Sequence, residues 1–258
     1  ETVGSSIINE SGDTRLDGVR ASSFKLTSTG NVTDGENAAI EVSGKTEVTA
    51  SGNVTLGNEV GDSILLGSIQ IDAKTVIIDE DSINGVSILD LSATALTLTS
   101  RGMIQSVANA TLNVANLATF NVAAGGASID LSQSNNGFGS LALTGGVVDV
   151  TERDSMSLSQ VTAGTLNLVA SGEVTDIGVI NVTGAMTINS GTRSIILDSV
   201  ANKFGTINVV GGDVQLVESN DSELGMVNVT RLTLNSGGVV SQTANSVLKV
   251  TVGALKID

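Results

Sequence analysis

Residues 138–188 read FGSLALTGGVVDVTERDSMSLSQVTAGTLNLVASGEVTDIGVINVTGAMTI, and the rest of the chain consists of copies of parts of this stretch. The run GEVTD at 172–176 matches GNVTD at 30–34, and INVTG at 180–184 matches IEVSG at 40–44. The members of each pair lie about 140 residues apart, and weaker copies lie between them at steps of about 70 residues. Self-similarity at a fixed period is the signature of a structural array.

The length of 258 residues then sets the number of repeats. We predict a single domain over residues 1–258, made of about 3.7 copies of a roughly 70-residue repeat. No break in the pattern leaves room for a linker. The apolar pattern does not close with a polar cap, either at Glu1 or in GALKI at 253–257. We therefore expect a fragment of a longer array, or subunits that stack end to end.

Apolar residues alternate with polar ones in short runs, as at Leu166/Leu168, Ile180/Val182 and Met186/Ile188. Each run predicts a strand of three to five residues, and Gly, Asn and Ser separate the runs about every eight residues. This spacing predicts an all-β fold: a parallel β-helix (β-solenoid), right-handed, with three short strands per coil of about 22 residues. One repeat would then be three coils, and the chain 11 or 12 coils. A propeller needs longer strands in antiparallel hairpins, and no stripe with helical periodicity exists.

The composition supports stacked strands and excludes several partners. Hydrophobic residues make up 40% of the chain and aromatic residues 2%, so Val, Ile, Leu and Ala must form the interior. The formal charge of −15 disfavours nucleic acid and anionic lipid. No apolar run reaches the roughly 20 residues that span a bilayer, so we expect no membrane insertion. The chain has no Cys, which excludes disulfides and zinc–thiolate sites.

Few residues remain for chemistry, because the chain also lacks His and Tyr. The densest acidic cluster is Asp79-Glu80-Asp81, and Glu152-Arg153-Asp154 and Glu218-Ser219-Asn220-Asp221 occupy related places in later repeats. Such clusters suit either a surface Ca²⁺ site or Asx-type turns with solvated neighbours. We favour turns, because no ligand spacing repeats outside the clusters. We predict no catalytic residue and no cofactor, and leave metal-ligating residues open.

Other residues admit a functional and a structural interpretation. Paired carboxylates can cleave polysaccharides, but the arginines that such a groove needs are scattered, at Arg15, Arg20, Arg101, Arg153, Arg193 and Arg231. Outward Thr97, Thr99 and Thr165 do not continue into the long ladder that ice binding needs. We predict that Phe138 and Phe204 fill coil corners. Five Asn-x-Thr sequences are predicted to be outward strand positions: Asn31, Asn53, Asn109, Asn181 and Asn228.

Four motifs together resemble a known family. They are N-x-F-G-x-L-x-L-x-G-G-x-V-x-V at 136–150, D-S-x-x-L at 154–158, G-x-V-T-D at 172–176 and I-x-V-x-G-x-x-x-I at 180–188. This run is similar to the repeats of bacterial filamentous haemagglutinin-like large exoproteins and giant surface adhesins. The resemblance covers nearly the whole chain. It implies secretion, location at the cell surface or in the extracellular matrix, and a stalk or adhesive role.

The sequence thus predicts a structural or adhesive extracellular β-solenoid that is not an enzyme. Expected partners are other copies of itself, stacked end to end into fibres, or neighbouring repeats of a longer chain, and host or environmental glycans. The alternative is a carbohydrate-binding or carbohydrate-cleaving β-helix, which a groove lined with acidic residues and Arg would favour.

Overall fold

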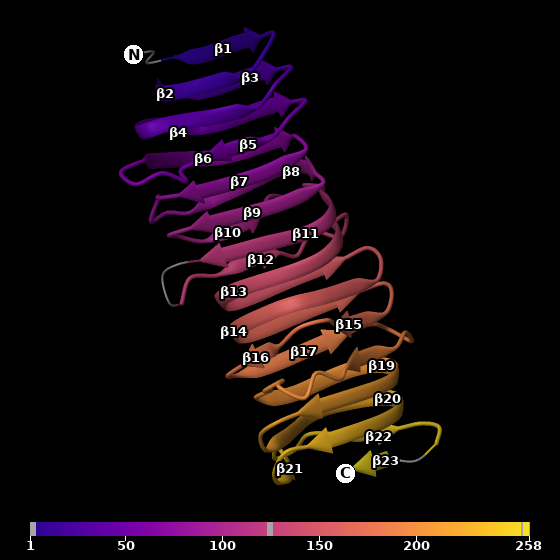
Figure 1. The fold of residues 1–258 in the computed structure, drawn as a ribbon. Helices are drawn as coiled ribbons and strands as arrows, with labels where there is room; N and C mark the ends of the chain where they lie inside the picture. The colour runs from indigo at the N-terminus through magenta and orange to yellow at the C-terminus, as the bar shows by residue number, and fades with distance from the viewer. Residues whose placement is uncertain (1–3, 123–125, 254, 258) are drawn as a thin grey trace. The chain divides into compact units, whose positions relative to one another are not determined.

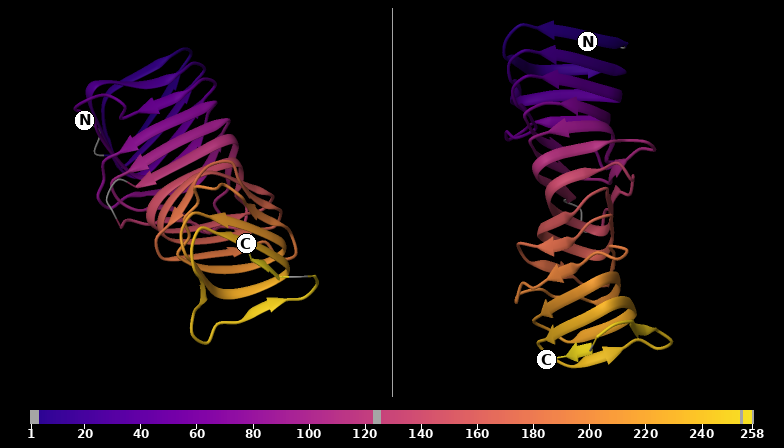
Figure 2. Two further views of the ribbon diagram at one scale, coloured as in Figure 1. Left: turned by 60° about the horizontal axis from the view of Figure 1, so that its bottom comes forward. Right: turned by 90° about the vertical axis from the view of Figure 1, so that its right-hand side faces the viewer.

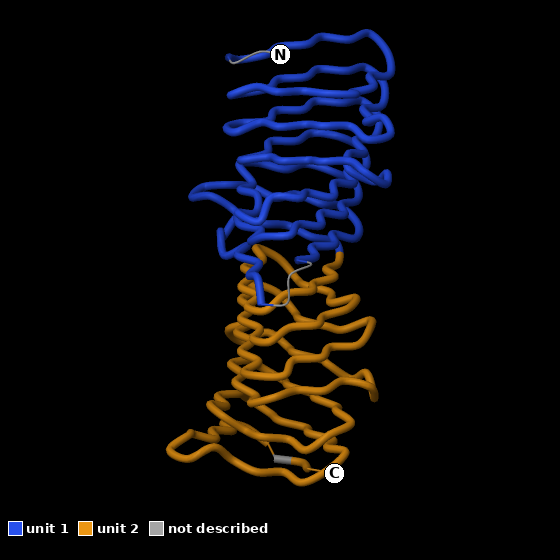
Figure 3. The backbone as a smooth tube through the Cα atoms, turned by 90° about the vertical axis from the view of Figure 1, so that its left-hand side faces the viewer, with its two compact units in different colours: residues 1–139 blue, residues 140–258 orange. Residues whose placement is uncertain are grey.

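The computed structural model of the chain describes residues 4–122, 126–253 and 255–257 (Figure 1). Glu1, where we expect the pattern to begin in the middle of a coil, and Ala254 in the last apolar run lie outside these residues. The chain divides into two compact units, residues 1–139 and 140–258 (Figure 3). Every regular element in the described ranges is a β-strand, and none is a helix. The predicted all-β class is therefore confirmed.

Unit 1 contains twelve strands and the start of a thirteenth. They are β1 (Ser5–Glu10), β2 (Thr14–Ala21), β3 (Ser23–Ser28), β4 (Val32–Ala50), β5 (Val54–Leu56), β6 (Ser63–Asp72), β7 (Thr75–Glu80), β8 (Val86–Ala93), β9 (Ala95–Ser100), β10 (Ile104–Ser106), β11 (Leu112–Val122) and β12 (Ile129–Leu131). Strand β13 (Gly137–Glu152) begins in unit 1 and continues into unit 2.

Unit 2 contains the remaining strands. They are β14 (Met156–Ala170), β15 (Val174–Asp176), β16 (Ile180–Val182), β17 (Ala185–Asn189), β18 (Ile195–Leu197), β19 (Thr206–Glu218), β20 (Ser222–Ser236), β21 (Val240–Gln242), β22 (Leu248–Val250) and β23 (Leu255–Ile257). Figure 2 shows the stacked strands of each unit in two further views.

Strands of successive turns pair in parallel, so each unit is a β-solenoid. In unit 1, Val32 pairs with Val54 and Val54 pairs with Val76, so each of these turns has the expected length. Thr14 pairs with Val32, which makes the preceding turn shorter. The units together hold about 12 turns, which confirms the predicted fold. Each turn hydrogen-bonds to the turns on either side, as solenoid repeats do.

Three sides make one turn, as unit 2 shows most clearly. The 15 residues of β14 pair in succession with the separate short strands β15, β16 and β17 of the next turn. The expected strand length of three to five residues is right for those three strands and wrong for β14 and for the 19-residue β4. In β4 the corner is turned by a register shift between Val42 and Lys45 rather than by a break. At this corner a Cβ on Gly44 would stand 2.6 Å from the carbonyl oxygen of Ser22, so only glycine fits.

Aliphatic side chains fill the interior of each turn. In unit 2, Leu168, Ile188 and Val209 occupy successive turns, and each is at most 1% exposed. Leu168 pairs with Ile188 and Ile188 pairs with Val209, so like residues stack on one another. Phe138 and Phe204 are 5% and 2% exposed, which confirms their predicted packing role. Phe138 meets Phe120 edge to face, with ring centroids 5.9 Å apart.

The sequence repeat does not equal three turns, and this corrects our expectation. In unit 1, Asn9 pairs with Thr27, Thr27 with Thr49 and Thr49 with Asp72, so three turns lead from Asn9 to Asp72. The residue equivalent to Asn9 in the next repeat is Asp79, which lies one strand further along, in β7. The prediction was wrong because it assumed a uniform coil, whereas turns such as the one from Thr14 to Val32 are shorter.

In unit 2, too, one sequence repeat is longer than three turns. Thr151 pairs with Val169, Val169 with Asn189 and Asn189 with Val210, so three turns lead from Thr151 to Val210. The equivalent of Thr151 in the next repeat is Val217, on the following side of the turn near the end of β19. One repeat is therefore three turns plus one strand, and equivalent residues within a unit lie on different sides of the turn.

We predict that Ile188→Ala lowers the free energy of unfolding by about 2–5 kcal/mol, because it leaves a cavity in the stacked core. The matched change Thr187→Ala, at the neighbouring outward-facing position, should cost less than about 1 kcal/mol. Urea unfolding followed by far-UV circular dichroism measures both. Equal losses in the two variants would contradict the inward–outward assignment.

Candidate functional site

The glutamates of the acidic clusters lie in the interior, which the sequence analysis did not predict. Glu80, Glu152 and Glu218 are 0%, 1% and 2% exposed. Each follows an alternating apolar run at a position whose side chain points inward, as in Ile78-Asp79-Glu80. Continued alternation was the signal that could have found them, because the residue two places after a buried Ile also faces the core.

The carboxylate of Glu80 ties three successive turns of unit 1 together. Its Oε1 accepts the backbone N–H of Leu66 in the preceding turn at 3.3 Å and that of Ser82 in its own turn at 2.9 Å. Its Oε2 accepts the hydroxyl of Ser100 in the following turn at 2.8 Å. Burial raises the pKa of Glu80, although the bonds from Ser100, Ser82 and Leu66 oppose this shift.

Glu218 repeats this arrangement in unit 2. Its Oε2 accepts the backbone N–H of Phe204 at 3.1 Å, and its Oε1 accepts the hydroxyl of Ser222. The Ser222 and Ser236 hydroxyls lie 2.9 Å apart, and Ser236 pairs with Glu218 in the next turn. Burial also raises the pKa of Glu218. A buried glutamate therefore pairs with a serine of the next turn twice, Glu80 with Ser100 and Glu218 with Ser236, whereas Glu152 pairs with Ala170.

Asp81 and Asp221 of these clusters, and Asp13 near the start of the chain, accept backbone N–H groups at the corners. Asp81 Oδ2 accepts from Ile64 at 3.1 Å, Asp13 Oδ1 from Asn31 at 2.7 Å and Asp221 Oδ1 from Val239 at 2.8 Å. Each bond joins two neighbouring turns. No group of three or more acidic residues in the described ranges is arranged to hold a metal ion. Whether Ca²⁺ binds these corners stays a prediction.

The arginines of the sequence analysis are spread over both units. Five of them pair with carboxylates that are exposed or, for Asp81, half-buried, at N–O distances between 2.7 and 3.8 Å: Arg15–Asp17, Arg20–Glu41, Arg101–Asp81, Arg153–Asp154 and Arg231–Asp213. The structure brings Arg101 close to Asp81. Burial and, after it, the negative charge of Asp81 raise the pKa of Asp79, and the positive charge of Arg101 opposes this rise. Exposed pairs of this kind contribute little stability.

Arg193 and Arg153 line a shallow depression on unit 2. Its other lining residues are Asp154, Ser155, Ser171, Gly172, Glu173, Thr192 and Ser194, and its volume is about 710 Å³. These residues come from the same corner of three successive turns. The depression therefore combines acidic residues with arginine, which is the combination expected for the carbohydrate alternative.

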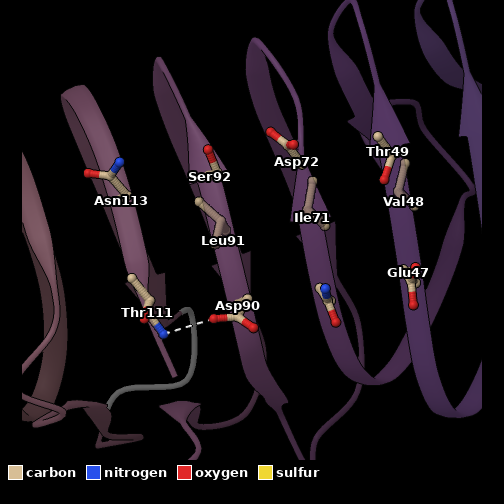
Figure 4. Close-up of a pocket in the computed structure, with 11 residues that line it drawn as sticks. Glu47, Val48, Thr49, Ile71, Asp72, Asp90, Leu91, Ser92, Thr111 and Asn113 are labelled. Atoms are coloured by element: carbon tan, nitrogen blue, oxygen red, sulfur yellow. Dashed lines mark hydrogen bonds between the residues drawn. The ribbon is translucent and has the colours of Figure 1, made fainter. Parts of the chain in front are cut away.

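A second depression, of about 370 Å³, crosses four strands of unit 1 (Figure 4). We call it the unit 1 polar face, and its outward side chains form two rows. One row is Glu47, Gln70, Asp90 and Thr111, and the other is Thr49, Asp72, Ser92 and Asn113. The residues between the rows, Val48, Ile71 and Leu91, are at most 2% exposed.

Two lysines lie at one end of the unit 1 polar face. Lys25 forms an ion pair with Glu47, and Lys45 contacts the same carboxylate at 2.7 Å. The hydrogen bonds from Lys25 and Lys45 lower the pKa of Glu47. At the other end, Asp90 Oδ1 accepts the backbone N–H of Thr111 at 3.0 Å (Figure 4).

The predictions for the Asn-x-Thr sequences are confirmed for some of these asparagines and wrong for others. Asn181 and Asn228 lie on strands, as predicted. Asn31 and Asn53 instead lie at corners just before strands, and Asn109 lies in a turn with φ of 65°. The threonine rows lapse as expected, since Thr97 pairs with Ile77 on one side, and Thr165 pairs with Val147. Among the described residues, no helix has the length and apolarity needed to cross a membrane.

A family model described as repeats of unknown function (DUF5649) matches three successive segments, at residues 3–64, 73–144 and 145–210. The starts of these segments follow the same period as the copies found in the sequence. Comparison with curated proteins and with solved structures gives no match. The number of repeats and the single-domain assignment stay predictions.

We predict that Glu80→Gln is tolerated and Glu80→Ala is not. Glutamine keeps the oxygen that accepts from Leu66 and Ser82, and its amide can donate to Ser100. Alanine removes the acceptor of the Leu66 and Ser82 N–H groups and should cost about 2 kcal/mol or more. Urea unfolding at neutral pH distinguishes the two variants, and Glu36→Gln, an exposed position, is the control for charge removal.

The raised pKa of Glu80 also determines whether its contribution to stability rises or falls with pH. Below the ordinary glutamate pKa of 4.5, this group is protonated in both the folded and the unfolded chain. As the pH rises from there through the folded pKa, the folded chain holds the proton longer, so stability falls. Stability of the wild type relative to Glu80→Gln should therefore decrease as the pH rises from 4.5 through the raised folded pKa of Glu80. A relative stability that rises with pH would contradict the burial of this carboxyl group.

Because the corner aspartates already accept backbone N–H groups, we predict that Ca²⁺ does not stabilise the chain. The thermal unfolding midpoint should be the same in millimolar Ca²⁺ and in EDTA, since only a ligand of the folded state raises it. A rise with Ca²⁺ that Asp79→Asn abolishes would instead establish a metal site at this cluster.

Proposed function

Because the chain belongs to the family of repeats of unknown function (DUF5649), and each unit is a β-solenoid, we propose that it is a structural and adhesive segment of an extracellular bacterial protein. In this role the chain is not an enzyme. It serves as a stalk or matrix segment of a surface adhesin or exoprotein. The resemblance to filamentous haemagglutinin-like repeats supports this proposal.

One observation carries the proposal: the conspicuous polar groups of the repeat hold turns together. Glu80 and Glu218 each accept hydrogen bonds from neighbouring turns, and Asp13 and Asp221 accept the amides of the turn that follows. Hydrogen bonds of this kind join successive turns in both units, so a solenoid can be lengthened by adding turns. This is what a stalk requires, because its function depends on length and on the outer surface.

The acidic surface suits a surface protein whose copies lie close together. The chain carries 27 acidic and 12 basic residues, so copies repel one another laterally. Open sheet edges, by contrast, attract further strands. Stacking end to end, with other copies or with neighbouring repeats of a longer chain, is therefore the form of self-association that we propose.

The carbohydrate alternative has one observation in its favour, the arginine-lined depression of unit 2. Arg153 and Arg193 lie there with Asp154 and Glu173, and hydroxyl groups surround them. A glycoside hydrolase needs two carboxyl groups on either side of the glycosidic bond, which Asp154 and Glu173 would supply. Turnover of an acidic or neutral glycan that is abolished by Arg193→Ala, or by Asp79→Asn or Asp81→Asn in the first acidic cluster, would favour this alternative.

We predict that antibodies against the chain label intact, unpermeabilised cells of the source bacterium. Electron microscopy of the purified protein should show isolated particles at low concentration and filaments as concentration rises. Labelling only after permeabilisation would overturn the extracellular role. A cytoplasmic protein of the same cells serves as the control for membrane integrity.

A further inference from the structure

We propose that the unit 1 polar face binds an uncharged polysaccharide that lies across its four strands. This inference rests on the proposed adhesive function and names both the surface and the chemical class of its ligand. The strands belong to β4, β6, β8 and β11, which pair in parallel in that order. Neighbouring strands are about 4.8 Å apart, so the rows present a polar group at each such step.

Three polar side chains in the middle of this face are available, unlike those at the corners. Gln70, Asp72 and Ser92 make no side-chain hydrogen bond and no ion pair within the part of the chain that the structure describes. They lie in adjacent turns, since Gln70 pairs with Asp90 and Asp72 with Ser92. Together they offer an amide, a carboxylate and a hydroxyl, which can donate to and accept from vicinal sugar hydroxyls.

The backbone of this face cannot itself recruit a partner. β6 and β8 have a paired strand on both sides, so their N–H and C=O groups are used in the ladder. Addition of a peptide strand, which needs an open edge, is therefore excluded at β6 and β8. The apolar side chains Val48, Ile71 and Leu91 point inward, so they form no apolar patch on the surface (Figure 4). A hydroxyl-rich ligand matches what remains.

The charges of the face favour a neutral ligand. Asp72 and Asp90 are exposed carboxylates in the middle of the depression, and they repel uronates and sulfated sugars. The nearby Lys25 and Lys45 are already paired with Glu47. The chain as a whole carries −15, which adds to the repulsion of anions. Carboxylates that accept from sugar hydroxyls form charge-assisted hydrogen bonds, which are the stronger kind.

The arrangement also predicts weak individual sites. The residues that line the face include no aromatic ring, so the stacking that usually strengthens sugar binding is missing. A polysaccharide that contacts several copies at once gains avidity without any new contact. This is the regime that suits an adhesive surface protein present in many copies.

The test uses the whole chain, immobilised, and a panel of cello-, manno- and galacto-oligosaccharides, with oligogalacturonate as the anionic counterpart. We expect at least one neutral oligosaccharide to bind and oligogalacturonate not to bind. The double variant Gln70→Ala/Asp72→Ala should weaken binding at least tenfold. The control Thr33→Ala/Thr55→Ala changes outward positions on another side of unit 1 and should bind as the wild type does.

Three results would overturn the inference: no binding of any neutral oligosaccharide, unchanged binding by the double variant, or binding that EDTA abolishes and that a metal ion therefore mediates. Far-UV circular dichroism confirms that the variants fold. Asp72→Asn adds a second criterion, because it keeps a hydrogen-bonding group while removing the charge, and should admit oligogalacturonate. Failure of these tests leaves surface labelling of intact cells unaffected, so the proposed adhesive role is judged separately.

Discussion

Every turn of this protein depends on the pairing of its backbone with the turns on either side. A buried N–H or C=O without a partner costs a good part of a hydrogen bond's free energy, and stacked parallel strands pair most of these groups. The corners are where that ladder is interrupted, and side-chain oxygens take over there. Asp13 and Asp221 accept amides of the following turn in this way. The acidic composition is thus partly a consequence of the fold.

The buried glutamates extend the same logic into the interior. Glu80 and Glu218 lie among aliphatic side chains, and their carboxylates are held by donors from adjacent turns. Burying a carboxylate is costly, and the raised pKa values record that cost. A buried polar group with its partners in place tolerates only one register between turns. The arrangement therefore favours a defined stacking register in a sequence whose aliphatic residues alone would permit several.

The mismatch between the sequence repeat and the turn decides on which side of a turn each surface residue lies. Because a repeat is three turns and one strand, equivalent surface residues move to another side of the turn at each repeat. A feature coded once per repeat cannot form a straight ladder on one side of a unit. The unit 1 polar face is consequently built from non-equivalent residues, such as Gln70, Asp90 and Thr111 in one row. Binding at such a face is a property of that part of the chain and not of the repeat.

The sequence by itself determined the class of fold, because period-2 alternation and a fixed repeat depend only on neighbours along the chain. It also placed Phe138 and Phe204 inside, and it favoured turn roles for the acidic clusters. Only the tertiary structure decided the length of each turn, the long strands β4 and β14, and the hydrogen-bond partners of Glu80. It alone brought Gln70, Asp72 and Ser92 to one surface. The reason is that a corner is turned either by a bulge or by a longer loop, so sequence distance does not fix which residues become neighbours one turn away.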